Sequence, residues 1–271
     1  MKSLIKGITN SSAKKKKSKK RKKIIIALVT LTLPLFLLLY IFVFKQGPYN
    51  HTVNISNDFD LKPGDILFQD LDCGRVCDAI ESVTSGADGA KVSHLAFVSH
   101  VDPDSKKVYI IESLAKGVEE VPIDKFLQRS FDKVKRPKVL VGRLNNFSER
   151  ELDKIVNRMR SFIGRAYDDI FTLDNDKYYC SELAHEVFRK GYKSEEEPGK
   201  AIFKLNKMTF KDPKDGKIMP VWKDYFDKLG VPVPEGKPGI NPGAISKSKH
   251  ITIMHAYGCP DNWAGCPDSS Y

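Results

Sequence analysis

Cys180 is the residue of this chain whose type and position point most directly to chemistry. It lies in residues 178–183, YYCSEL, which predict the first turn of a helix. The positive end of a helix dipole and the unpaired N–H groups there favour the thiolate form of a cysteine, which is its nucleophilic form. A lone cysteine in a folded domain is more commonly a small buried apolar residue. The hypothesis of a cysteine hydrolase therefore depends on whether the rest of the chain supplies partners for the thiol.

Two upstream residues, His94 and Glu112, could be those partners. Residues 94–101 and 107–113 predict two strands, joined by a strong turn signal, DPDS, at 102–105. A hairpin centred on that turn would put His94 opposite residue 113, give or take one, and Glu112 within cross-strand reach. A one-residue shift or a bulge decides whether both side chains share a face of the sheet. A carboxylate beside the imidazole would fix its tautomer, and the imidazole could then accept the Cys180 proton.

The other histidines are weaker candidates for this pairing. His185 is five residues from Cys180, about 500° of rotation along a helix, and so on a different face. His100 is at the turn end of its strand, where we expect exposure. His250 and His255 stay open alternatives, and His94 could equally be a hydrogen-bonded core residue.

The cysteine count supports a reactive role for Cys180. Cys259 and Cys266 enclose a short loop and could form a disulfide, and Cys73 and Cys77 could form another near the geometric limit of an i,i+4 pair. That pairing leaves Cys180 as the odd thiol. A zinc site is the alternative, but neither spacing is a standard one. We therefore predict no metal and no cofactor.

The positive charge of the chain is concentrated in one tail. The formal net charge is +11, but residues 1–23 hold eleven Lys or Arg and no acid, which leaves 34 basic and 34 acidic residues elsewhere. A nucleic-acid-binding domain would be expected to carry a basic face on its folded part. The distribution argues against a nucleic-acid partner.

Residues 24–44 predict a transmembrane signal anchor. They hold no charged residue, and 21 residues in a helix span about 30 Å, the thickness of a bilayer core. A cleaved signal peptide is the alternative, but this apolar stretch is too long and no small-residue cleavage site follows it. The positive-inside rule then places residues 1–23 in the cytoplasm and the rest of the protein, from residue 45, outside it.

The remaining chain fits one α+β domain, in which an antiparallel sheet packs against helices. Residues 45–60 form a polar stalk, and 61–271 form the domain, which is long enough for a well-developed core. We expect strands at 65–69, 94–101, 107–113 and 139–144, and a short helix at 123–128. The clearest helix is 148–163, where Ser148 and Glu151 predict a capping box. Residues beyond 193 show weak periodicity, apart from a helical turn at 222–226.

Several segments, taken in this order, resemble a known family. It is the YiiX/YebB-like group, a circularly permuted branch of the NlpC-type papain-fold hydrolases, related in fold to lecithin:retinol acyltransferase. In the permuted branch the histidine precedes the nucleophile, as here. The resemblance covers residues 61–192, and its segments are PGDILF (63–68), SHLAFV (93–98), IES (111–113), AYD (166–168) and YCSEL (179–183).

This resemblance implies a permuted papain-like fold and a role for each site residue. Cys180 would be the nucleophile, His94 the general base and then acid, and Glu112 the residue that orients His94. The Cys180 backbone N–H would help to bind an oxyanion. Four neighbours are further candidates for substrate or oxyanion binding: Tyr167, Asp168, Tyr179 and Ser181. Leu95 and Ala96 stand where family members more often have Gly or Val close after the histidine.

The sequence therefore predicts a membrane-anchored, extracytoplasmic cysteine hydrolase that cleaves an amide or ester through a thioacyl intermediate. Its substrate could be a peptidoglycan peptide or a lipid acyl group, and hydrolysis or acyl transfer would both fit. A second hypothesis is a tethered, non-catalytic module that binds wall or lipid fragments. A third is an interaction protein that acts through its basic tail.

Overall fold

The computed structural model describes residues 59–191 and 202–266. The predicted basic tail at 1–23, the membrane anchor at 24–44 and nearly all of the stalk at 45–60 lie outside these described residues. Within them, none of the helices combines the length and the apolar character needed to cross a bilayer.

The architecture centres on a six-stranded sheet in which every neighbouring pair is antiparallel. The spatial order is β4-β3-β2-β1-β5-β8. This confirms the predicted antiparallel sheet. In chain order, its strands are β1 (Ile66–Gln69), β2 (His94–Val101), β3 (Val108–Leu114), β4 (Gly117–Pro122), β5 (Val139–Leu144) and β8 (Ile251–Ala256).

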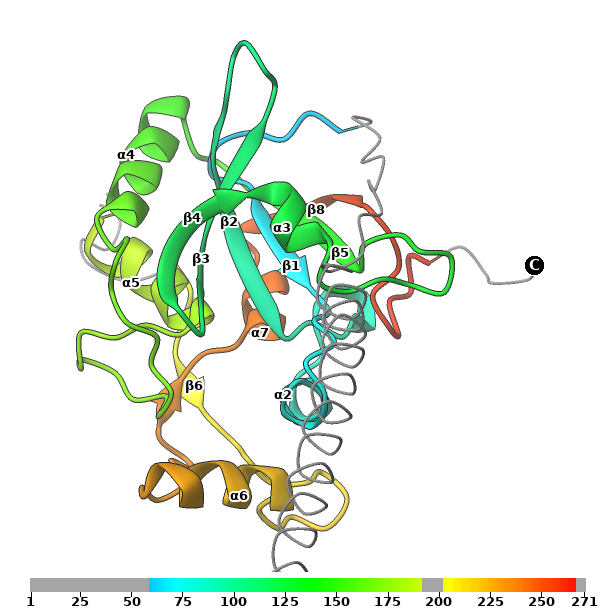
Figure 1. The fold of residues 1–271 in the computed structure, drawn as a ribbon, viewed down its shortest axis with the longest axis vertical. Coiled ribbons are helices and arrows are strands. Elements are labelled where there is room, and N and C mark those ends of the chain that lie inside the picture. The colour runs from blue at the N-terminus through cyan, green and yellow to red at the C-terminus, as the bar shows by residue number, and fades with distance from the viewer. Residues whose placement is uncertain (1–58, 192–201, 267–271) are drawn as a thin grey trace, which may run out of the picture. The chain divides into compact units, whose positions relative to one another are not determined.

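Helices cover the sheet, and each face has its own apolar core (Figure 1). On one face, α4 (Glu149–Arg160), α5 (Cys180–Gly191) and α7 (Pro242–Ser246) pack against side chains such as Phe68 and Phe97. On the other, the short α3 (Ile123–Leu127) packs Phe126 against Leu67 and Val98. Alternate residues of β2 therefore point into different cores, as a pleated strand requires.

The two helices that were clearest in the sequence form where expected. Ser148 caps α4, its side chain accepts from the Glu151 N–H, and the Glu151 carboxylate accepts from the Ser148 N–H, which is the predicted capping box. The second helix, α5, starts at Cys180 itself. The nucleophile candidate therefore occupies the first helical position.

A third apolar cluster lies beyond the end of the sheet, where α2 (Arg75–Val83) meets α6 (Pro220–Leu229). Figure 1 shows α6 below the sheet, connected to it through the small ribbon of β6 (Asn206–Lys207) and β7 (Pro238–Gly239). Trp222 and Phe226 of α6 are buried in this cluster. Residues 202–240, which showed little periodicity, thus build an aromatic subdomain beside the nucleophile helix.

The sequence analysis missed the two outermost strands, β4 and β8. Both are edge strands with one neighbour each. Glu119 and Glu120 interrupt the apolar pattern of β4, and in β8 Ile251 alone is buried while the other five residues are exposed or half-buried. Edge strands tolerate polar and charged side chains, so their hydrophobic period is weak.

A bulge in the β2–β3 hairpin sets the geometry of the candidate site. Near the turn Val101 pairs with Val108, but the register shifts between Val98 and His100, so that Ala96 pairs with Glu112. This register places His94 opposite residue 114, within the predicted margin of one residue around 113. Because side chains on one face repeat every two residues, the shift places His94 and Glu112 on the same face of the sheet.

Two disulfides tie down the loops outside the sheet. One joins Cys73 to Cys77 at the start of α2, and the other joins Cys259 to Cys266 near the C-terminus. Cys180 is the free cysteine.

Candidate active site

The Cys180 thiol is held at the start of α5 in a nearly closed environment. The residue is 7% exposed. The Leu95 backbone N–H of β2 hydrogen-bonds to its sulfur, and the Ser181 hydroxyl lies 3.7 Å from Sγ. Groups that donate to sulfur stabilise a thiolate, as does the N-terminus of a helix.

His94 lies between Cys180 and Glu112 and contacts both. Its Nε2 is 2.8 Å from Glu112 Oε2, and the imidazole also hydrogen-bonds to the Cys180 thiol. Because Nε2 is taken by the carboxylate, Nδ1 is the ring nitrogen left for the thiol. The tautomer is fixed by this arrangement, in the manner of a nucleophile–base–carboxylate triad.

The electrostatics of this pair favour a thiolate and an imidazolium. Burial alone would lower the pKa of His94, but the hydrogen bonds to Cys180 and Glu112 outweigh it and raise that pKa to about 9. Burial would raise the pKa of Cys180, but the hydrogen bond and the charge of His94 lower it below its ordinary value. Each group stabilises the ionised form of the other.

Arg129 is a member of this constellation that the sequence analysis missed. It forms a bidentate pair with Glu112, with Nη1 2.5 Å from Oε2 and Nη2 on Oε1. Burial would raise the pKa of Glu112, but the hydrogen bonds from Arg129 and His94 lower it to about 2. Arg129 follows α3 in a polar stretch without distinctive spacing, so no local pattern identified it.

The first turn of α5 adds no negative charge against the thiolate at neutral pH. Glu182 lies two residues after Cys180 and is buried, and its carboxylate accepts the Tyr179 backbone N–H. Burial raises the pKa of Glu182 to about 9, so the carboxyl group is neutral near pH 7. The first N–H groups of a helix lack intrahelical partners and can bind an oxyanion.

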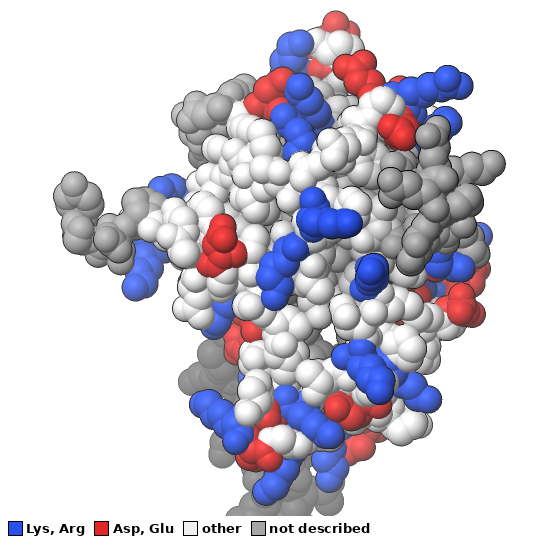
Figure 2. Space-filling model, turned by 180° about the vertical axis from the view of Figure 1, so that it is seen from behind, with Lys and Arg blue, Asp and Glu red and all other residues white. Residues whose placement is uncertain are grey.

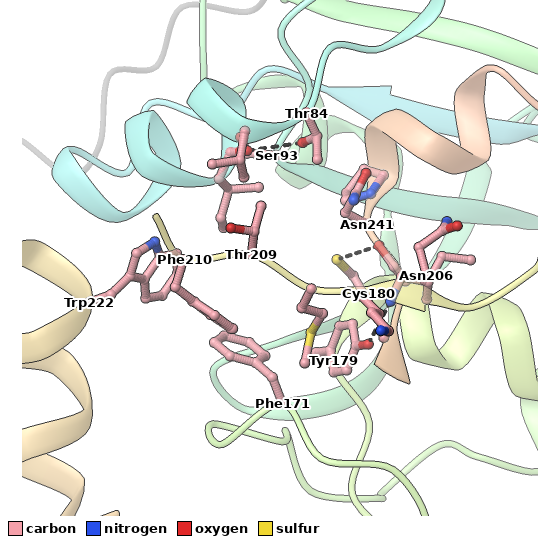
Figure 3. Close-up of a pocket in the computed structure, with 18 of the residues that line it drawn as sticks. Thr84, Ser93, Phe171, Tyr179, Cys180, Asn206, Thr209, Phe210, Trp222 and Asn241 are labelled. Carbon is pink, nitrogen blue, oxygen red and sulfur yellow. Dashed lines mark hydrogen bonds between the residues drawn. The ribbon is translucent and has the colours of Figure 1, made fainter. Parts of the chain in front are cut away.

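An apolar cavity of about 290 Å³ opens beside the thiol (Figure 3). In Figure 3 the Cys180 sulfur points into this space, and Phe171, Phe210 and Trp222 lie on the side away from it. Part of the wall comes from residues 206–210 and 239–242, which follow the nucleophile helix in sequence. The polar groups of the lining include Ser93, Asn206, Thr209 and Asn241.

The four further candidates have different surroundings. Tyr167, Tyr179 and Ser181 line the cavity, and the Tyr179 hydroxyl accepts the Ile240 backbone N–H at 3.2 Å. Asp168 is fully buried, and its carboxylate accepts the N–H groups of Ile170 and Thr172. Asp168 therefore shapes the loop after Tyr167 and is not part of the cavity lining, contrary to the expectation that it could bind substrate.

Three other histidines have partners of their own. His185 Nδ1 is 2.7 Å from the Phe203 carbonyl oxygen, so this residue connects α5 to the segment after it. His100 stacks on Tyr109 and hydrogen-bonds to Ser99. His255 stacks on Phe59. Of the described histidines, His94 is the one that hydrogen-bonds to Cys180.

Comparison with known families identifies the class of protein. A family model described as permuted papain-like amidase enzyme, YaeF/YiiX, C92 family, matches residues 60–255. The chain belongs to this family. The YaeF/YiiX match extends beyond the residues that showed the resemblance in the sequence and includes the segments that wall the cavity. The protein is thus a cysteine hydrolase with a permuted papain-like fold.

One solved structure gives the same fold. It is titled crystal structure of metalloprotein yiiX from Escherichia coli O157:H7, DUF1105, and matches with a TM-score of 0.58 at 20% identity over 73% of this chain and 98% of that one. No curated protein matches. Among the described residues, no cluster of three or more His, Cys, Asp or Glu side chains could hold a metal ion. The metal in that title is stated of the yiiX protein alone.

Proposed function

We propose that this protein is a membrane-anchored, extracytoplasmic hydrolase that removes an apolar acyl group from an amide or ester through a thioacyl intermediate. The observation that carries this proposal is the hydrogen-bonded chain from Cys180 through His94 to Glu112, which ends at an apolar cavity.

In the first half of the reaction, the Cys180 thiolate attacks the substrate carbonyl carbon. The carbonyl oxygen becomes an oxyanion, and the N–H of Cys180 at the start of α5 would donate to it. His94 gives its Nδ1 proton to the leaving nitrogen or oxygen as the carbonyl carbon to leaving-group bond breaks. The products of this step are the free amine or alcohol and a thioester on Cys180.

In the second half, neutral His94 accepts a proton from water, and the resulting hydroxide adds to the thioester carbon. The carbon–sulfur bond breaks, the acid is released, and Cys180 returns to the thiolate beside the imidazolium. Glu112 keeps the imidazole oriented and stabilises its charge in both halves.

The lining of the cavity favours an apolar acyl group over a wall peptide. The wall opposite the thiol is formed by the aromatic and aliphatic side chains of Phe171, Phe210 and Trp222, and Lys207 is the single charged side chain among the described lining residues, so a stem peptide rich in carboxylates would find few matching charges. The volume is at the small end of the range for ligand pockets, about 300–1,000 Å³. We therefore propose a lipid acyl group of short to medium length as the preferred substrate class.

The apolar segment 24–44 would keep the enzyme close to such substrates. It holds no charge over 21 residues and follows a tail of eleven basic residues. An uncleaved anchor in this orientation would place the hydrolase domain on the extracytoplasmic side of the membrane.

A series of acyl p-nitroanilides tests the substrate class. We expect turnover that rises from acetyl to octanoyl and declines again at longer chains, together with no turnover by Cys180→Ser. A purified muropeptide digest serves as the competing substrate class. Cleavage of muropeptides without cleavage of any acyl anilide would contradict the acyl-group proposal, and no hydrolysis of either would favour the binding-module hypothesis.

Filling the cavity should change this chain-length preference. Thr209 lines the cavity, and Thr209→Trp should raise KM for the octanoyl substrate about tenfold while leaving the acetyl substrate within about twofold. The matched control is Thr252→Trp, which changes an exposed threonine on β8 outside the cavity. Equal effects of Thr209→Trp on both substrates would show that the acyl chain lies elsewhere.

Membrane anchoring has its own test. The full chain, produced in a bacterial host, should remain in the membrane fraction after washing with alkaline carbonate and should dissolve only with detergent. Release by carbonate alone would show that segment 24–44 does not span the bilayer.

A further inference from the structure

Arg129 and His94 bind the same oxygen of Glu112. Oε2 of this carboxylate is 2.8 Å from His94 Nε2 and 2.5 Å from Arg129 Nη1, while Oε1 accepts from Arg129 Nη2. Two donors that share one acceptor atom are coupled directly. A change at Arg129 therefore reaches the imidazole through a single carboxylate.

The charges of the hydrogen-bonded side chains Cys180, His94 and Glu112 balance only when Arg129 is included. The side chains of Glu112 and His94 are 0% and 2% exposed, and Cys180 is 7% exposed, so water stabilises none of them well. A thiolate, an imidazolium and a carboxylate together carry one negative charge. Arg129, whose side chain is 22% exposed, neutralises it at the solvent side of the site. Buried charge without a partner is costly.

Few other charged groups face these hydrogen-bonded side chains. Glu119 on β4 pairs in register with Glu112 on β3. From the loop before α5 and from its N-cap, the Tyr167 and Tyr179 hydroxyls interact with Cys180, and buried Glu182 lies in the first turn of the helix. None of these groups brings a positive charge, so Arg129 is the cation that faces Glu112 from α3 and its following turn.

We propose that Arg129 is a positioning residue of the hydrolase, which acts through Glu112 to hold His94 in a fixed orientation and to keep Cys180 as a thiolate. The inference rests on the proposed function, because it assigns a role within the Cys180–His94 pair. Arg129 itself does not reach the reacting sulfur.

Electrostatics gives the direction of the effect. Loss of a positive charge favours the protonated form of every neighbouring group, so Glu112 and Cys180 should both hold protons more tightly without Arg129. A guanidinium also fixes both carboxylate oxygens in one plane, which a single amine cannot do. Loss of the positive charge at position 129 should therefore move the pH at which the Cys180 thiol ionises. A substitution that keeps the charge but removes the planar guanidinium should mainly lower kcat.

The test uses alkylation of Cys180 by iodoacetamide in the detergent-solubilised full chain, followed by mass mapping. The rate is measured from pH 4 to pH 10 for wild type, Arg129→Gln, Arg129→Met and Arg129→Lys. Arg143→Gln is the matched control. Arg143 also makes a bidentate pair with a buried carboxylate, that of Asp65, and lies over a phenyl ring, but it lies beside a turn without a catalytic residue.

We expect the midpoint of the alkylation rate against pH to move to higher pH in Arg129→Gln and Arg129→Met, the two variants that are neutral at position 129. At the pH where the wild-type thiol is half ionised, a one-unit shift lowers the rate about fivefold. Rates should converge at pH 10, where the thiol is ionised in every variant, which shows that the reagent still reaches the sulfur. Arg129→Lys and Arg143→Gln should keep the wild-type midpoint, and Arg129→Lys should still lower kcat on the octanoyl anilide.

Two results separate the possible failures. A wild-type midpoint that depends on His94 but is unmoved in the folded neutral variants would overturn the role of Arg129 alone. A wild-type thiol with an ordinary midpoint that does not depend on His94 would overturn the proposed function itself.

Discussion

The same structural device occurs twice in this molecule, once in the candidate active site and once in a turn. Arg129 pairs with Glu112 and lies over Phe126, with its guanidinium carbon 5.6 Å from the ring centroid. Arg143 pairs with Asp65 and lies over Phe59 at 5.2 Å. Both carboxylates are buried, and the two arginine side chains are 22% and 26% exposed.

The two pairs differ in the third group that binds the carboxylate. Asp65 Oδ2 accepts the backbone N–H of Lys62 at 2.8 Å, which closes the turn before β1. Glu112 Oε2 instead binds His94, which contacts Cys180, the free cysteine in the part of the chain that the structure describes. A buried arginine–carboxylate pair is therefore no sign of catalysis by itself. The function depends on which third group shares the carboxylate with the arginine.

The largest difference should appear when each carboxylate is changed to its amide. Glu112→Gln removes the charge that stabilises the His94 imidazolium and should lower kcat on the octanoyl anilide about 10²- to 10⁴-fold. Asp65→Asn should leave kcat within about threefold. Steady-state kinetics of both variants checks this, and comparable losses in the two would mean that the pairs are not functionally different.

The pH profile of kcat should sharpen the contrast. Activity requires protonated His94 as the general acid, so it should fall about tenfold per pH unit above about 9, the raised pKa of this residue. Loss of the Glu112 charge destabilises the imidazolium, so Glu112→Gln should move this limb to lower pH, toward the ordinary value near 6.5.

The Asp65→Asn profile provides the comparison for that measurement. This variant should keep the wild-type limb, because Asp65 has no contact with His94. A wild-type profile that is already falling at pH 7 would contradict the raised pKa of His94.

Stability should respond similarly at the two pairs. Arg129→Gln and Arg143→Gln each leave a buried carboxylate without its guanidinium partner, which should cost about 3 kcal/mol of unfolding free energy. Urea denaturation at pH 7 measures both. A loss confined to Arg129→Gln would indicate that the Arg143 pair is not a comparable structural element.

The smallest effect is expected at the aromatic rings beneath the arginines. Phe59→Leu should lower the unfolding free energy by about 0.5–1 kcal/mol through the lost cation–π contact, with unchanged activity. Phe126→Leu should cost somewhat more, because this ring is fully buried and also lies 5.7 Å from the His94 ring. Thermal melts and kinetics of the two variants check this ranking.

The parts of the fold that local patterns specify could be predicted from the sequence. The capping box at Ser148 marks the start of α4, the segment at Cys180 marks the start of α5, and the turn at 102–105 marks the β2–β3 hairpin. The edge strands β4 and β8 have weak apolar periods, so their pairing depends on neighbours far away in sequence. The cavity wall from residues 206–242 has no local signature for the same reason.

The candidate site was predictable as a set of residues but not as a geometry. The types and order of His94, Glu112 and Cys180 indicated the chemistry. A bulge between Val98 and His100 determines the shared face of His94 and Glu112, and no residue type in that strand signals it. Arg129 joins the site through a tertiary contact across 17 positions of sequence. Its role depends on burial, which composition and spacing do not reveal.

The most direct test of the central claim is the ionisation of Cys180 in the full chain. Iodoacetamide labelling is followed against pH with mass mapping in wild type, His94→Ala and, as the unlabelled control, Cys180→Ala. The account predicts fast labelling confined to Cys180, with a midpoint well below about 8.5 that rises when His94 is lost. Labelling at an ordinary midpoint, or a midpoint that is indifferent to His94, would contradict the thiolate–imidazolium pair.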